Sequence, residues 1–122
     1  PSLGVTLDRR GRFPAAGGPT TIWLGLGTGR ASVERLAEAV RTALERCALD
    51  FDHKPARPHL TIARVLPDAS AIEVRALVLA LERARVAELR FEVRTVEVIE
   101  SLLTPRGPRY AVRSSVPLED GP

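Results

Sequence analysis

The sequence predicts an α+β fold built on a mainly antiparallel sheet. Short runs rich in β-branched and other apolar residues recur along the chain, and two longer segments carry apolar residues at spacings of three and four. A turn containing proline and glycine joins the last two strand-like runs directly, as in a β-hairpin. The resulting order of strand, strand, helix, strand, helix, strand and strand is typical of an α+β protein.

The N-terminal region predicts two strands separated by a long loop. Residues 3–7 alternate apolar and small side chains and are expected to form the first strand. Residues 8–19 are rich in arginine, glycine and proline, which indicates a loop. Residues 21–26 are expected to form the second strand, and Trp23 on this apolar run is expected to lie in the core.

The first helix is predicted over residues 33–48, with Ser32 as its N-cap. Its apolar residues repeat at three and four positions and form a stripe on one side of the helix. Cys47 falls on this stripe, and free cysteine is among the most buried residue types. We therefore expect Cys47 to lie in the core.

The most informative segment is the run Arg57-Pro58-His59-Leu60-Thr61-Ile62-Ala63-Arg64, which predicts a buried strand. His59 and Thr61 are two residues apart, so in a strand their side chains leave the same face. Leu60 and Ile62 are expected to face the core on the other side. An imidazole beside a small hydrogen-bond donor suits proton transfer in phosphodiester chemistry.

The C-terminal region predicts a second helix and a hairpin. Ser70-Ala71-Ile72-Glu73 has the pattern of a capping box, and the helix that it begins is expected to run to about Ala84. Residues 91–100 and 109–116 are rich in β-formers and predict two strands. Residues 104–108 form the turn between them, which carries an arginine.

Composition bounds the class of protein. The 122 residues are expected to form one domain, residues 1–122, and a composition of 44% hydrophobic and 27% charged residues is ordinary for a globular protein. No apolar run approaches the ~20 residues needed to span a bilayer, so no membrane partner is expected. A single cysteine cannot form an internal disulfide, which suits a reducing cytoplasm, the expected location.

The charge pattern and the motifs limit cofactors and partners. The net charge is +3, and Lys54 is the only lysine among the 18 basic residues. Arginine binds phosphate through a bidentate fork, so this bias is compatible with an RNA partner, although charge alone supports one only weakly. The sequence has no glycine-rich phosphate loop and no Cys/His cluster with metal-ligand spacing, so neither a nucleotide cofactor nor a metal is expected.

The run around His59 resembles the second His-x-Thr-x signature of the 2H phosphoesterases, and most closely that of the bacterial RNA 2′,3′-cyclic phosphodiesterase and 2′-5′ RNA ligase family. Further segments are similar to that family in the same order along the chain. They are Gly11-Arg12-Phe13-Pro14, Thr21-Ile22-Trp23-Leu24-Gly25-Leu26, Glu100-Ser101 with Pro105-Arg106-Gly107-Pro108-Arg109-Tyr110, and Val116-Pro117-Leu118. The resemblance implies a bilobal fold with curved antiparallel sheets and helices packed outside.

The chain departs from the family pattern in one respect. The family carries two His-x-Thr-x signatures, whereas this chain has two histidines, and His53 is followed by Lys54-Pro55. At the near-repeat Gly4-Val5-Thr6-Leu7, glycine stands where the histidine would have to be. The match to the Gly-x-Phe-Pro segment suggests that the chain starts after the first signature. We expect it to be the C-terminal portion of a longer 2H domain.

The resemblance implies a reaction and the residues that perform it. In the family, the two signature histidines act as acid and base and the threonines hold phosphate oxygens, without a metal or other cofactor. RNA 2′,3′-cyclic phosphate ends are opened to 2′-phosphates, and an RNA 5′-hydroxyl in place of water gives 2′-5′ ligation. RNA ends or nucleotide cyclic phosphates would therefore be the partners. The expected catalytic residues are His59 and Thr61, and the expected substrate- and phosphate-binding residues are Arg64, Arg57, Tyr110 and Phe13.

Two of these assignments have competing interpretations. Strict alternation along the strand puts Arg64 on the face opposite His59, so it reaches the site only if the strand bends or ends there. Tyr110 and Phe13 match aromatic residues of the family, but core packing is the more common role for such residues.

Three hypotheses follow for the whole protein. The first is a cyclic phosphodiesterase whose first signature lies outside these residues. The second is a non-catalytic RNA- or nucleotide-binding module that keeps half of the site. The third is a dimer in which two copies of His59 face each other across a two-fold axis.

Overall fold

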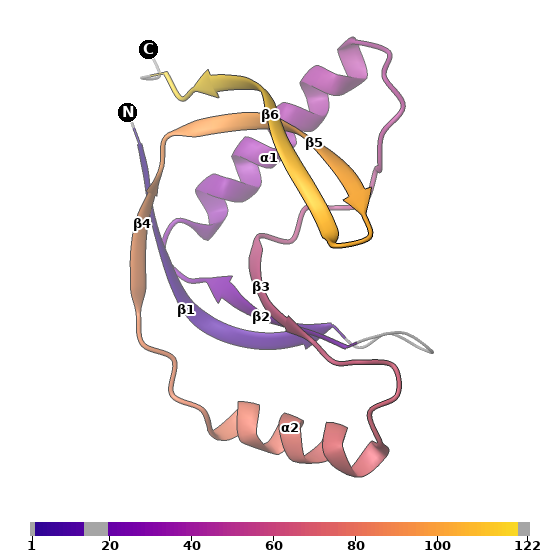
Figure 1. Ribbon diagram of the computed structural model, residues 1–122. Coiled ribbons are helices and arrows are strands. Elements are labelled where there is room, and N and C mark those ends of the chain that lie inside the picture. The colour runs from indigo at the N-terminus through magenta and orange to yellow at the C-terminus, as the bar shows by residue number, and fades with distance from the viewer. Residues whose placement is uncertain (1, 14–19, 120–122) are drawn as a thin grey trace. The chain divides into compact units, whose positions relative to one another are not determined.

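The structure is a computed structural model, and it describes residues 2–13 and 20–119. The elements of this part of the chain, in order, are β1 (Leu3–Phe13), β2 (Thr21–Leu26), α1 (Arg30–Arg46), β3 (His59–Arg64), α2 (Ala71–Arg83), β4 (Leu89–Val93), β5 (Thr95–Thr104) and β6 (Gly107–Pro117) (Figure 1). These elements form two compact units, one running from Gly4 to Phe91 and the other built mainly from Glu92 onward.

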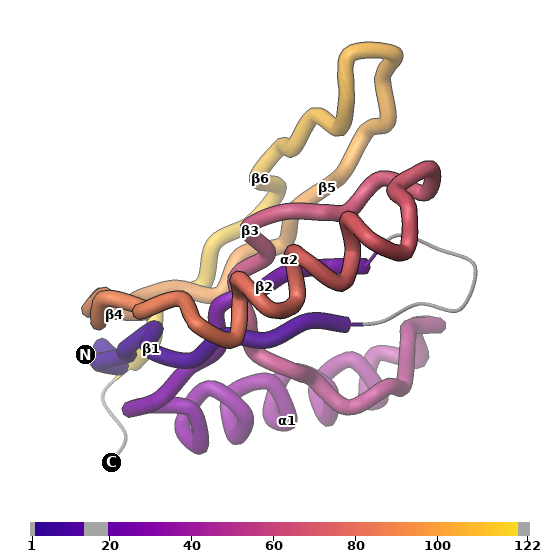
Figure 2. Tube along the Cα trace, turned by 90° about the horizontal axis from the view of Figure 1, so that it is seen from below, coloured from indigo at the N-terminus to yellow at the C-terminus, as the bar shows by residue number. Residues whose placement is uncertain are grey.

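The strands form two sheets. One has four strands in the order β3-β2-β1-β4, and the other is the two-stranded β5-β6 hairpin. The pairs β1-β2, β2-β3 and β5-β6 are all antiparallel. Figures 1 and 2 show that β1 curves along its length, with β2 beside it. The predicted α+β class with a curved antiparallel sheet is therefore confirmed.

The first strand is much longer than predicted, because it continues through residues expected to form a loop. β1 stays paired with β2 as far as the pair Phe13–Thr21, after an irregularity in register near Asp8. Backbone pairing to β2 compensates for the weak strand preference of the arginine-rich segment. Gly11 lies within this strand and not in a turn. It leaves room for the Trp23 indole, which a Cβ at this position would overlap. The rest of the predicted loop, residues 14–19, lies outside the described residues.

The first helix starts earlier than predicted and does not use Ser32 as its cap. Its N-cap is Gly29, whose φ of 82° is a left-handed conformation that favours glycine. Ser32 lies in the first turn and accepts a hydrogen bond from Arg35 at 3.0 Å. The expectation that Cys47 is buried is wrong: it is the exposed C-cap residue, beyond the last turn of the helix.

The capping box of the second helix is confirmed. The Ser70 hydroxyl accepts from the Glu73 backbone N–H at 3.2 Å, and the Glu73 carboxylate accepts from the Ser70 backbone N–H at 2.8 Å. Hydrogen bonding of the Glu73 carboxylate to the Ser70 backbone N–H and, with a smaller effect, to the Ser70 side chain lowers the pKa of Glu73. Near the other end of α2, Arg10 of β1 donates to the Glu82 carbonyl oxygen, which links the helix to the sheet.

The C-terminal strands differ from prediction in two details. The run over 91–100 is two strands, β4 and β5, interrupted at Arg94. The hairpin turn is tighter than expected, because only Pro105 and Arg106 lie between the paired residues Thr104 and Gly107. Gly107 has a φ of 112°, which a side chain would disfavour.

The core of the described residues is small and lies on β1 and β2. Its members are Val5, Leu7, Ile22 and Leu26, each less than a tenth exposed. The prediction that β3 is a buried strand is wrong for this structure: Leu60 is 50% and Ile62 57% exposed. β3 is an edge strand of the sheet, so it has a paired neighbour on one side only. Neither helix of the described residues is long and apolar enough to cross a membrane.

Candidate functional site

The pairing of β2 with β3 sets the face on which the signature residues lie. His59 is opposite Gly25, and Thr61 is opposite Trp23. Residues opposite each other in an antiparallel pair project to the same side of the sheet, as do residues two apart along a strand. His59, Thr61 and Trp23 therefore share one face, and Gly25, opposite His59, leaves room for the Trp23 ring, which a Cβ there would overlap.

The His59 ring is held by one hydrogen bond and one aromatic contact. Its Nδ1 lies 2.5 Å from the carbonyl oxygen of Arg57. A carbonyl oxygen can only accept a hydrogen bond, so Nδ1–H donates and carries the proton of the neutral ring. Phe13 meets the imidazole edge to face, with ring centroids 4.9 Å apart and an interplanar angle of 86°. Nε2 is therefore the nitrogen left to exchange a proton with a ligand.

An aromatic cluster continues from His59 across the sheet. The Trp23 ring lies 5.2 Å from Phe13 and 6.4 Å from His59 between centroids. Trp23 is half-buried, with its Nε1 covered and without a hydrogen-bond partner among the described residues. The expectation that Trp23 is simply a core residue is thus wrong in part, because its ring lies on the His59 face. No local pattern in the sequence indicates this, since only the register with β3 brings the two rings together.

Two hollows open at His59. One, of about 270 Å³, is lined by Trp23 and Arg30 and extends to the start of α1. The other, of about 760 Å³, is lined by Lys54 and Pro55 of the arm between α1 and β3. Phe13, Arg57 and His59 line both hollows, so the structure brings these three predicted site residues together. The Arg57 guanidinium carbon lies 6.0 Å from the Phe13 ring centroid, which is a cation–π distance.

Sequence reasoning did not include Arg30 and Lys54 in this site. Arg30 is the first residue of α1 and forms an ion pair with Glu34 at 2.8 Å, so it resembles an ordinary surface residue. Lys54 stands out in the sequence as the only lysine, and this was the one signal available for it.

A β-bulge settles on which side of β3 Arg64 lies. Ile22 pairs with Ala63 but Trp23 pairs with Thr61, so Ile62 is an extra residue on β3. Beyond the bulge, Arg64 is opposite Thr21, which is two residues from Trp23 and shares its face. Strict alternation predicted the opposite face for Arg64, and the bulge reverses that expectation.

Tyr110 belongs to a different compact unit of the chain from the other candidate residues. It is on β6 opposite Ser101, in the unit that contains the hairpin. Its side chain is 69% exposed, so it does not pack in a core of the described residues. Phe13, in contrast, packs against Trp23 and His59 and is half-buried.

Among the described residues, no three His, Cys, Asp or Glu side chains come together as a metal site would require. The hollows at His59 are instead lined by aromatic rings and by the guanidinium groups of Arg30 and Arg57. This arrangement suits an anionic ligand that carries an aromatic base.

Comparison with known proteins identifies the family. The 2′-5′ RNA ligase superfamily model matches residues 1–104. The chain is 30% identical over 107 residues to an RNA 2′,3′-cyclic phosphodiesterase of Aeropyrum pernix, covering 87% of this chain and 59% of the relative. It is 31% identical over 106 residues to one of Archaeoglobus fulgidus, covering 87% and 57%.

The chain thus spans less than two thirds of the length of the curated relatives it matches. The matched region contains the aromatic cluster, the signature strand and both helices. The resemblance seen in the His-x-Thr-x run is therefore confirmed, and the chain belongs to the 2′-5′ RNA ligase superfamily.

Proposed function

We propose that this protein is an RNA 2′,3′-cyclic phosphodiesterase in which His59 is one of two proton-transfer groups. The observation that carries the proposal is the hydrogen bond of 2.5 Å from His59 Nδ1 to the Arg57 carbonyl oxygen. It leaves Nε2 as the exchangeable nitrogen on a face shared with Thr61. Membership of the superfamily and the names of the two archaeal relatives support the same activity.

The proposed reaction opens the cyclic phosphate to a 2′-phosphate. A bond forms between a water oxygen and phosphorus, and the bond between phosphorus and the ribose O3′ breaks. A base takes the water proton on one side of phosphorus, and an acid gives a proton to O3′ on the other. His59 suits either part, because neutral Nε2 accepts a proton and protonated Nε2 donates one. The reaction needs no metal, so we expect chelators to leave its rate unchanged.

The neighbouring residues have proposed roles in binding the substrate. The Thr61 hydroxyl would donate to a non-bridging phosphate oxygen, and Arg64 and Arg57 would balance the phosphate charge. The bulge in β3 supports this role for Arg64, and the lining of both hollows supports it for Arg57. Phe13 would contact the sugar or base of the terminal nucleotide, and the exposed ring of Tyr110 is suited to stacking on a base.

The same chemistry extends to ligation. If an RNA 5′-hydroxyl takes the place of water, the same bond to O3′ breaks and a 2′-5′ phosphodiester forms. The proton transfers are the same in both reactions, since one proton leaves the attacking oxygen and one reaches O3′. We therefore propose reversible 2′-5′ ligation as a secondary activity, and the family's description supports it.

One observation favours a second candidate function, an RNA-binding module without catalysis. Among the described residues that line the two hollows, His59 is the only side chain with an imidazole or carboxyl group, the groups most used for proton transfer. Loss of proton transfer on one side of phosphorus typically costs ~10² to 10⁴-fold in rate. A chain with one such group would still bind phosphate through Thr61 and the arginines.

The test is hydrolysis of an RNA oligonucleotide that ends in a 2′,3′-cyclic phosphate, with the product identified by phosphorus NMR. The complete encoded protein should release the 2′-phosphate, and His59→Ala should lower kcat by ~10² to 10⁴-fold without changing the thermal unfolding temperature. Binding of the oligonucleotide without hydrolysis would instead establish the binding module. Activity that appears only in a dimer fraction would identify a site shared between two copies.

A further inference from the structure

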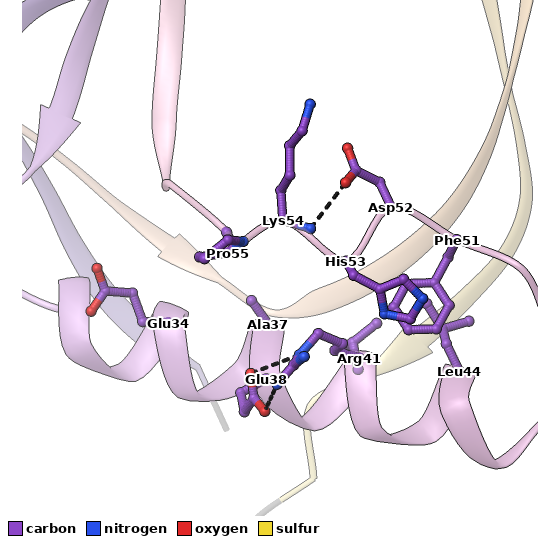
Figure 3. A pocket seen from close by; sticks show the side chains of 12 residues that line it. Glu34, Ala37, Glu38, Arg41, Leu44, Phe51, Asp52, His53, Lys54 and Pro55 are labelled. Atoms are coloured by element: carbon purple, nitrogen blue, oxygen red, sulfur yellow. Dashed lines mark hydrogen bonds and ion pairs between the residues drawn. The ribbon is translucent and has the colours of Figure 1, made fainter.

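Besides the two hollows at His59, a further cavity of about 520 Å³ lies between α1 and the arm of residues 51–56 (Figure 3). All of its lining residues are within the unit that also carries His59. Its volume is in the range of small-molecule sites, which is roughly 300 to 1,000 Å³. None of the residues discussed above for catalysis lines this cavity.

The cavity has an aromatic and apolar side. Phe51 and His53 of the arm are stacked, with ring centroids 4.2 Å apart and an interplanar angle of 42°. Val40 and Leu44 of α1 provide aliphatic surface across from the arm. Figure 3 shows the His53 ring turned toward Phe51 and α1. A flat heteroaromatic ring can stack on such a surface, because every nucleobase has a π-face.

The charges of the cavity favour a neutral group over a phosphate. The Arg41 guanidinium is already bound by Glu38, at 3.0 Å from its Nε, and lies 3.7 Å from Glu45. Glu34 and Asp52 add further carboxylates to the lining. A phosphate in this position would face several carboxylates with Arg41 already paired. The amino and imino groups of a base, in contrast, could donate to those carboxylates.

The cavity and one of the hollows at His59 share lining residues on the arm. Lys54 and Pro55 line both this cavity and the hollow of about 760 Å³ that contains Arg57 and His59. Figure 3 shows the Lys54 side chain extending away from α1, and the Asp52 carboxylate accepts from the Lys54 backbone N–H at 2.9 Å. Two cations, Lys54 and Arg57, thus line the hollow at His59, and one of them, Lys54, also lines the cavity beside α1.

We infer that the arm from Phe51 to Arg57 binds the nucleotide that precedes the cyclic phosphate end of the RNA. Its base occupies the cavity between the arm and α1, and the phosphate that links it to the terminal nucleotide lies against Lys54 and Arg57. This inference rests on the proposed function and deepens it, because it makes the substrate an RNA end of at least two nucleotides. A cyclic mononucleotide fills only the His59 part of the site.

The experiment compares cytidine 2′,3′-cyclic phosphate with a dinucleotide that ends in the same group, using the complete encoded protein. We expect a KM about ten-fold lower for the dinucleotide, the magnitude of one stacked base. Phe51→Ala and His53→Ala should abolish this ten-fold preference and leave kcat/KM for the mononucleotide unchanged, since neither residue lines the hollows at His59. Lys54→Ala should reduce the preference. His53 is exposed, so its variant reports on binding even if Phe51→Ala fails to fold.

Arg35→Ala is the matched control for loss of charge. Arg35 is an exposed cation of α1 that does not line the cavity, so its variant should keep the dinucleotide preference. Equal KM values for the two substrates in the wild-type protein would overturn the inference while leaving the proposed function intact. If neither substrate is hydrolysed, the proposed function fails. Calorimetry then compares binding of the 2′-phosphate forms of the mononucleotide and the dinucleotide. Equal affinities for these two compounds overturn the inference about the arm.

Discussion

At the level of single residues, the site is organised by what surrounds the Trp23 and His59 rings. Gly25, opposite His59, and Gly11, opposite Trp23, both leave space for the indole of Trp23. The position of the indole then fixes where Phe13 and His59 can pack. Glycine is required at these two strand positions by close approach of a ring, not by backbone conformation.

Substitution at Gly11 tests this packing. A Cβ there would overlap the Trp23 ring, so we expect Gly11→Ala to lower the free energy of unfolding by about 1–3 kcal/mol, as overpacking does. Urea unfolding followed by the fluorescence of Trp23, the only tryptophan, measures the change. Gly4→Ala is the control, since no atom lies within 4 Å of a Cβ at Gly4. Equal losses in both variants would contradict the role assigned to Gly11.

The Thr61 hydroxyl is expected to act on the phosphate and not on the fold. Its side chain is exposed in the described structure, so Thr61→Val should leave the unfolding temperature unchanged. It should lower kcat/KM for a cyclic phosphate by about ten-fold or more, the usual effect of losing a hydrogen bond to a charged group. Thr95→Val on β5 provides the matched control. A loss of stability without a loss of activity would assign Thr61 a structural role.

At the level of elements, the bulge in β3 decides what the signature strand presents. One extra residue at Ile62 moves Arg64 from the Leu60 face to the Thr61 face. We expect Arg64→Ala to weaken binding of a 2′-phosphate product by about ten-fold, measured by calorimetry, because a charge-assisted hydrogen bond is lost. Arg75→Ala, on the exposed side of α2, should bind normally. Equal affinities of the Arg64 and Arg75 variants would argue against the bulge having this role.

The capping box makes the stability of α2 depend on pH. Hydrogen bonds from Ser70 lower the pKa of Glu73 in the folded state, so the carboxylate form is favoured by folding. A lowered pKa contributes stability above the unfolded value of about 4.3, and this contribution is lost as the pH falls through the folded value. We expect Ser70→Ala to cost about 1 kcal/mol at pH 7 and less at pH 3. Urea unfolding at the two pH values measures this.

Glu73→Gln separates the charge from the hydrogen bond in this box. Glutamine can still accept from the Ser70 N–H, but it does not titrate, so the variant should lose part of the pH dependence and keep the helix. Circular dichroism of the two variants reports helix content directly. An unchanged pH dependence in Glu73→Gln would show that other carboxylates dominate the acid response.

At the level of the whole molecule, buried side chains are unevenly distributed between the two units. The buried residues of the described part of the chain lie on β1 and β2, whereas apolar residues of the hairpin are exposed, Leu103 at 89%. A two-stranded hairpin is only marginally stable by itself. In the 122-residue chain we therefore expect amide hydrogen exchange to be slowest in β1 and β2 and clearly faster in β5 and β6. Mass spectrometry of deuterated peptides measures this, and equal protection would contradict it.

Much of the fold followed from local rules that the sequence states directly. Residues 21–26, the capping box at Ser70 and the final hairpin were predicted correctly, because alternation, cap chemistry and turn residues act over a few positions. The extension of β1 to Phe13 was missed because its strand character comes from pairing with β2 and not from its own residues. Cys47 was misplaced because the helix ends before it, so the apolar stripe has no turn there to continue on.

The sequence by itself determined the superfamily and which strand carries the two signature residues of the candidate site. The His-x-Thr spacing on a strand placed His59 and Thr61 on one face, because strand side chains alternate with a period of two. Only the tertiary structure decided which further groups join them. The β2-β3 register brings Trp23 and Phe13 to His59. The bulge moves Arg64 to the face of β3 that carries Thr61, and the arm places Lys54 in the lining of a hollow at His59. These relations depend on pairing between distant segments, and a one-residue change in register reverses them, so no local pattern could specify them.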